Sequence, residues 1–185
     1  MKRWMLIVSA LSVAMVGCTT VTTWFPWLSW QTRTTGKAVL QPTAPQSPLT
    51  GVVKFVETSE GLRMTASVQH APPGAHGFHI HEVGSCEDGA RAAGSHYNPA
   101  GSKHGYLPKE GFLNAHAGDF GNISVGKHGS GSTTLLIPML TLVGGSYPVA
   151  WKSVILHANA DDFTSQPTGN AGDRIACGII EVKGK

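Results

Sequence analysis

The sequence predicts an all-β protein of the sandwich or barrel kind. Short runs rich in β-branched residues recur after about residue 36, and Gly, Pro, Asn and Ser separate them. Gly is abundant, with 23 of 185 residues, and charged residues make up only 14% of the chain, which suits a turn-rich β domain better than a helical one. No convincing amphipathic helix stands among these runs. A stretch of roughly 150 residues is enough for one domain with its own core.

Six strands are expected in order along the chain. Five are the runs LTGVVKFVET (49–58), LRMTASVQH (62–70), STTLLIPMLTL (132–142), KSVILH (152–157) and IACGIIEV (175–182). The other contains His79 and His81, which share one face because side chains alternate along a strand, while Phe78 and Ile80 point to the core. Residues 86–116 are rich in Gly, Asn, Pro and Ala without any period, which predicts a long functional loop.

Seven residues of metal-binding type stand in or near this region. They are His79, His81, His96, His104, His116, Asp119 and His157. Imidazole suits copper and zinc, and a carboxylate is an acceptable zinc ligand. A single first-row metal needs fewer ligands, so the set predicts two adjacent sites that share one residue. Of the remaining histidines, His70 and His128 have no recognisable context and are expected to be solvated.

Five segments resemble the signature segments of copper/zinc superoxide dismutase, in that family's order. They are GFHIHEVGSCE, AGSHYNPAGSKHG, HAGDFGN, VILHANADD and GNAGDRIACGII, and the resemblance runs from about Gly36 to Lys183. It implies a Greek-key β-sandwich or flattened barrel with long metal-binding and active-site loops, over residues 36–185. It also implies an enzyme that converts superoxide to oxygen and hydrogen peroxide by alternate reduction and oxidation of copper.

The resemblance assigns a role to each residue. Copper is expected on His79, His81, His96 and His157, and zinc on His96, His104, His116 and Asp119. His96 would be the bridging imidazolate and a proton source. Arg174 would dock the anion, with a surface ion pair to Asp173 as the alternative. Asp161 would link a copper histidine to a zinc histidine, with a plain turn aspartate as the alternative.

A different class of function stays open, namely a copper-binding or copper-delivery lipoprotein on the same fold without turnover. A delivery protein should expose labile soft ligands such as a Cys-x-x-Cys or a Met cluster, and the mature sequence has neither. A purely structural metal module is the third alternative. The complete zinc set and Arg174 favour the enzyme.

The first residues predict export. Lys2 and Arg3 precede an apolar stretch over residues 4–16, which is typical of a signal peptide over 1–17. Met15-Val16-Gly17-Cys18 resembles a bacterial lipobox, with a lipidated Cys18 beginning a tether over 18–35. We therefore expect a protein of the bacterial cell envelope that faces the periplasm, anchored in the outer membrane by default. An ordinary signal peptide cleaved nearby is the alternative.

Aromatic residues crowd the tether. Trp24, Phe25, Trp27, Leu28 and Trp30 form either a collar at the bilayer surface or a cluster packed on the domain or a partner subunit. A homodimer stays open. Without Lys2 and Arg3, 12 basic residues face 11 acidic ones, so the charge gives no reason to expect nucleic acid.

The cysteine count supports export. Three cysteines are an odd number, and lipidation of Cys18 would account for one. Cys86 and Cys177 then remain as one possible disulfide in an oxidising compartment, with buried free thiols as the alternative, and the family resemblance pairs the same two.

The segment 158–173 departs from the family's usual pattern, because it is short and contains no Lys or Arg. Charge that steers an anion toward copper would then come from Arg91, Lys103 and Lys109 in the earlier loop. The alternative is that these are ordinary solvated charges.

Overall fold

The computed structural model describes residues 33–183, and these residues confirm the all-β prediction. The strands are β1 (Thr35–Pro42), β2 (Thr50–Thr58), β3 (Gly61–Gln69), β4 (Gly74–His81), β5 (Asp119–Val125), β6 (Gly131–Ile137), β7 (Leu140–Thr141), β8 (Tyr147–Pro148), β9 (Ser153–His157), β10 (Arg174–Ile179) and β11 (Glu181–Lys183). Two short helical turns, η1 (Arg91–Ala93) and α1 (Leu107–Glu110), interrupt the long loop after β4. No helix within the described residues is long and apolar enough to cross a bilayer.

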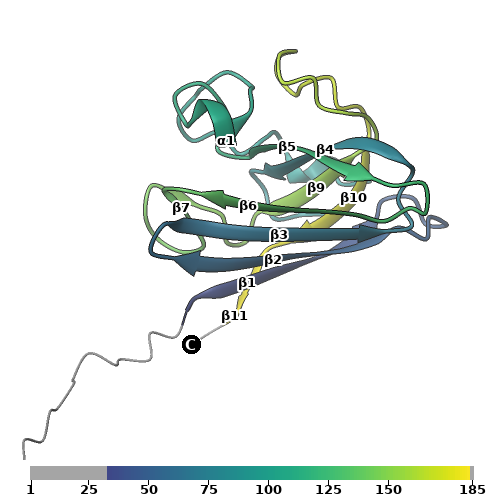
Figure 1. Cartoon of the computed structure of the whole chain (residues 1–185), viewed down its shortest axis with the longest axis horizontal. Helices are drawn as coiled ribbons and strands as arrows, with labels where there is room; N and C mark the ends of the chain where they lie inside the picture. The colour runs from purple at the N-terminus through teal and green to yellow at the C-terminus, as the bar shows by residue number, and fades with distance from the viewer. Residues whose placement is uncertain (1–32, 184–185) are drawn as a thin grey trace, which may run out of the picture. The chain divides into compact units, whose positions relative to one another are not determined.

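Eight strands close into an antiparallel barrel. Their order is β10-β9-β4-β5-β6-β3-β2-β1, and β1 pairs back onto β10 through Gln41 and Pro42. The connections β3–β4 and β6–β9 each pass over two intervening strands, which is Greek-key topology (Figure 1). Closure leaves these strands without a free edge, so the barrel is a fixed frame for the loops above it.

The core follows from alternation along strands such as β3. In β3 the side chains of Leu62, Met64, Ala66 and Val68 are buried and the residues between them are exposed. Phe55 of β2 and Phe78 of β4 are among the largest fully buried side chains of the same apolar cluster. Burial of this apolar surface is the main favourable contribution to folding.

Strands β4 and β9 are buried on both faces, unlike β3. Phe78 and Ile80 of β4 face the barrel core, as expected. The opposite face of β9 is covered as well, since Ile155 packs with Ala90, Ala93 and Cys177 under the loop that follows β4. A strand covered on both sides reads as a continuous apolar run, which is why KSVILH shows no alternation.

Three strands were not among the expected runs, namely β1, β5 and the two-residue β8. The inner face of β1 consists of Gly36, Ala38 and Leu40. Only Leu40 is a large apolar residue, so the run carries little strand signal. β5 contains Gly121 and Asn122, which usually indicate a turn. The expected run 132–142 divides at Pro138 into β6 and β7, because Pro cannot donate to the ladder. β1 begins one residue before the expected domain boundary at Gly36.

The disulfide between Cys86 and Cys177 is confirmed. It joins two residues 91 apart in sequence, with their Cα atoms 5.7 Å apart. The bond ties the loop before η1 to strand β10. Ser153 reinforces the same junction, since its buried hydroxyl donates to Val83 O at 2.8 Å and accepts from Ser85 N–H at 3.0 Å. The signal peptide, Cys18 and the aromatic cluster lie outside the described residues.

Candidate metal centre

The seven expected ligands meet in two groups that share one residue. The first group is His79, His81, His96 and His157, and the second is His96, His104, His116 and Asp119. Within each group the potential ligand atoms lie within 4.8 Å of one another, and every residue is buried. β4 supplies His79 and His81 side by side, β9 supplies His157 at its end, and β5 supplies Asp119 at its start.

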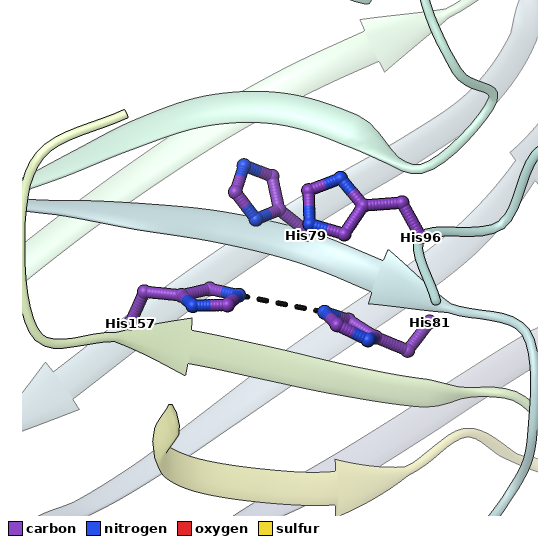
Figure 2. Close-up of side chains that lie close together, drawn as sticks. All are labelled: His79, His81, His96 and His157. Carbon is purple, nitrogen blue, oxygen red and sulfur yellow. Dashed lines mark hydrogen bonds between the residues drawn. The ribbon is translucent and has the colours of Figure 1, made fainter. Parts of the chain in front are cut away.

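In the first group, two imidazoles turn their Nε2 atoms toward each other. Nδ1 of His81 donates to Gly94 O at 2.9 Å, and Nδ1 of His157 donates to Gly172 O at 3.0 Å. A neutral imidazole carries one proton, so both Nε2 atoms then present lone pairs. These two atoms lie only 3.4 Å apart, joined by the dashed line in Figure 2. Two facing lone pairs repel unless a cation or a proton lies between them.

The second group is organised by the carboxylate of Asp119. The Nδ1 atoms of His96, His104 and His116 lie 2.8, 2.9 and 3.2 Å from its two oxygens. The carboxylate also accepts the backbone N–H of Gly105 and of His116, both at 3.0 Å. One carboxylate oxygen with three imidazole nitrogens is a ligand set that suits tetrahedral zinc.

The carboxylate of Asp161 joins the two groups. Its Oδ2 accepts from His79 Nε2 at 2.8 Å, and its Oδ1 accepts from His104 Nε2 at 2.9 Å. Each histidine is therefore held by Nε2 and directs Nδ1 into its own group. The side chain of Asp161 is fully buried and makes both contacts. Asp161 is therefore the expected link between the two groups and not a plain turn aspartate.

Two further residues hold Asp161 in place. The side-chain amide of Asn122 accepts from Asp161 N–H at 2.7 Å and donates to Asp161 O at 2.9 Å. Gly169 lies flat against the Asp161–His104 contact, with φ of +65°. A Cβ at this position would lie 1.9 Å from Asp161 Oδ1 and 2.5 Å from His104 Nε2, so only glycine fits.

Three buried nitrogens have no hydrogen-bond partner among the described residues, namely His79 Nδ1, His96 Nε2 and His104 Nδ1. An unsatisfied buried polar atom costs about 1–3 kcal/mol. His104 Nδ1 is unpartnered although Asp119 Oδ2 lies 2.9 Å away, because the contact lacks hydrogen-bond geometry. Such a contact is expected between two ligands of one ion. The donor set therefore fits a metal in each group.

The protonation states of the three histidines with lowered pKa values agree with metal binding. Burial lowers the pKa of His81 to about 2, of His157 to about 3 and of His96 to about 4, with neighbouring histidines adding to the effect in each case. Their imidazoles are neutral near pH 7, which is the form that coordinates metals. For Asp119, burial opposes the charged form, but close contacts with the Nδ1 atoms of three histidines hold its pKa well below the usual range.

Arg174 does not form the surface ion pair with Asp173. Its guanidinium instead donates to the carbonyl oxygens of Ala90, Arg91 and Gly94, with 2.7 Å to Gly94 O. All three carbonyls belong to the loop that Cys86 ties to β10. Gly94 O also accepts from His81, so the guanidinium is one carbonyl away from a ligand of the first group.

The expected steering residues differ in their surroundings. Arg91 forms an exposed ion pair with Asp88, in which its Nε donates to Asp88 Oδ2 at 2.9 Å. Arg91 and Arg174 nevertheless line one cleft of about 530 Å³. Lys103 and Lys109 are exposed. Of the other histidines, His76 is buried, while His70 and His128 are exposed.

Sequence reasoning missed Asn122, Gln166 and Gly169. These residues make side-chain-to-backbone hydrogen bonds or a close approach between loops. Such contacts leave no periodic pattern in the sequence. Asn122 stands within HAGDFGN and Gly169 within GNAGDRIACGII, so the segments were noticed but these two residues were not given a role.

A closed Greek-key barrel with two histidine-rich groups sharing one imidazole defines a metalloprotein with a two-metal centre. The chain matches the family model described as copper/zinc superoxide dismutase (SODC) over residues 49–180, and it belongs to that family. The family binds copper and zinc, and the two histidine groups fit such sites.

Asp161→Asn should weaken metal binding. When His79 and His104 bind metals through Nδ1, both Nε2 atoms are donors, and asparagine offers them only one acceptor oxygen and an NH₂ group that faces the other donor. Loss of such an outer hydrogen bond typically costs about 10–100-fold in metal affinity. Chelator competition measures the effect, with exposed Asp173→Asn as control. Unchanged affinity for both metals would show that Asp161 does not position the ligands.

Proposed function

We propose that the protein is a superoxide dismutase, with copper in the first group and zinc in the second. One observation carries the proposal, namely the position of His96 in both groups. Its Nδ1 lies 2.8 Å from Asp119 in the second group, while its buried Nε2 has no partner among the described residues and belongs to the first. A shared imidazole with two chemically different ends is suited to exchange a proton at Nε2.

Copper supplies the one-electron chemistry when bound, because zinc has a single accessible oxidation state. In the balanced reaction, two superoxide anions and two protons give one oxygen and one hydrogen peroxide. Arg174 binds the anion through its fixed positive charge, which no change near neutral pH removes. His96 holds one of the protons at Nε2 and delivers it to the reduced anion, and water supplies the other.

The remaining residues orient these two groups. Asp119 holds His96 at Nδ1, so the imidazole keeps its position while its Nε2 gains or loses a proton. Gly94 O fixes His81 and Arg174 together, which sets the anion beside the first group. The burial of all seven ligands excludes bulk water from the metal side of the centre.

Copper delivery is less well supported. Transfer to a partner requires ligands that the partner can reach, and the four residues of the first group are at most 3% exposed. An anion-binding arginine beside the site has no purpose in storage or delivery.

The mature protein should bind one copper and one zinc per chain and remove superoxide. His157→Ala should weaken copper and spare zinc, because His157 belongs to the first group alone. His116→Ala should release zinc first, because His116 belongs only to the second. Elemental analysis and superoxide consumption by the metal-loaded protein measure these effects. Normal metal content without superoxide removal would exclude the enzyme and favour the binding protein.

Arg91→Glu should lower the second-order rate for superoxide and reduce its fall with added salt, at unchanged copper content. Arg91 shares a cleft with Arg174 and Asp173, so Arg91 gives the cleft its net positive charge, and a positive cleft raises the rate of anion capture. The ion pair with Asp88 limits the effect, so Asp88→Asn should raise the rate. Stopped-flow kinetics at several ionic strengths tests both variants. Equal rates and equal salt dependence would show that Arg91 does not steer.

We propose that Cys18 becomes the lipidated N-terminus and anchors the domain in the bacterial envelope, facing the periplasm. The lipobox-like sequence before Cys18 and the disulfide, which belongs in an oxidising compartment, support this. Cys18→Ala should leave the chain uncleaved or mislocalised with the enzyme domain active. Membrane fractionation and mass spectrometry of the N-terminus decide, and an unacylated wild-type chain starting after Cys18 would contradict it.

Association of two copies is proposed as a way to cover the exposed side chains of Leu113, Met139 and Val143. Sedimentation velocity of the mature protein tests it, and a monomer at micromolar concentration would contradict it.

A further inference from the structure

The segment 158–173, between β9 and β10, contacts the second metal group at a place that the metal chemistry does not require. The side-chain amide of Gln166 meets the backbone of His104. Its Oε1 accepts from His104 N–H at 2.8 Å, and its Nε2 donates to His104 O at 3.0 Å. The amide thus pairs with one residue's backbone much as a neighbouring strand would.

Among the described residues, no other group hydrogen-bonds to the N–H or the C=O of His104. His104 is 1% exposed, so loss of the amide would leave two backbone groups of a buried residue unpaired. Gln166 itself is exposed, and its Nε2 also donates to Thr164 O at 3.2 Å. The amide is therefore accessible from solvent but is directed inward onto a metal ligand.

His104 is consequently held at both ends by one segment. Asp161 fixes its ring at Nε2, and Gln166 fixes its backbone five residues later. The segment is closed on itself, because Asp162 N–H donates to Gly169 O at 2.9 Å and Gly169 N–H donates to Ser165 O at 2.7 Å. This closed turn carries Gln166 as a unit, whereas Asp161 just before it is held by Asn122 of β5, so Gln166 can separate from His104 while Asp161 stays in place.

We propose that Gln166 is a positioning residue for zinc. Its amide holds the backbone of His104 so that Nδ1 stays in the second group, and zinc leaves when this amide separates from His104. The proposal rests on the assignment of zinc to the second group. The short segment 158–173 has no basic residues and therefore cannot steer an anion. In this proposal its role is to hold a zinc ligand instead.

Gln166→Leu keeps the size of the side chain and removes both hydrogen bonds. In the fully metallated mature protein, zinc release into a chromogenic chelator should become at least about tenfold faster, the lower end of what outer hydrogen bonds to metal ligands contribute. Copper release should be unchanged, since Gln166 touches no residue of the first group. Cobalt(II) placed in the second group should show an altered visible spectrum, which a general loss of stability would not produce.

Two further variants separate positioning from loosening of the segment. Ser165→Ala removes the hydrogen bond from Ser165 Oγ to Asp162 Oδ2 (2.6 Å) and leaves the Gln166 amide in place. It should release zinc at the wild-type rate. Gln166→Glu keeps the acceptor for His104 N–H but sets a carboxylate oxygen against His104 O in place of the donor, so its zinc release should also be faster than that of wild type. If the leucine variant fails to fold, the glutamate variant decides.

The outcomes test the role of Gln166 separately from the assignment of zinc to the second group. Wild-type release rates in both Gln166 variants, or equally fast release in Ser165→Ala, would overturn the positioning role and leave zinc in the second group. A wild-type protein that binds no zinc would overturn the zinc assignment and this role together. Faster zinc release in the Gln166 variants alone, with the cobalt spectrum shifted, supports the proposal.

Discussion

The carboxylate of Asp161 is the interaction on which the rest of the site depends. It accepts hydrogen bonds from His79 and His104, one in each metal group, and so fixes which nitrogen each ring presents. Without it, the two rings would be free to present either nitrogen. The position of this carboxylate is in turn set by Asn122 on β5, so the barrel wall determines the geometry of the loops above it.

Burying two carboxylates among histidines is costly unless charge is balanced. Asp119 and Asp161 are both buried, and hydrogen bonds from the histidines hold the pKa of each below its usual range despite burial. The same contacts raise the pKa of His104 to about 9, since they outweigh the burial that would lower it. Bound cations would take over this balancing role, because they supply positive charge at the nitrogens that now lack partners.

The sequence predicted the fold and the ligands to different depths and for different reasons. The β-branched content of runs such as LRMTASVQH predicted strands such as β3, and the His79–His81 spacing predicted two rings on one face. β5 was missed because Gly121 and Asn122 resemble a turn, yet Asn122 is needed there to hold Asp161. The number of ligand-type residues predicted two sites that share one residue, and the family resemblance assigned each residue to its site. The Gln166 contact could not be predicted, because it joins two irregular segments 62 residues apart.

The two groups that share His96 differ in how far apart their ligands lie along the chain. The second group lies within one loop and the start of β5, with His96 and Asp119 only 23 residues apart, whereas His81 and His157 of the first group are 76 apart. The difference in loop-closure entropy is only about 1 kcal/mol. The difference in architecture is greater, since the first group exists only when β4 and β9 are paired. A chain still lacking β9 already carries all four ligands of one site and three of the other.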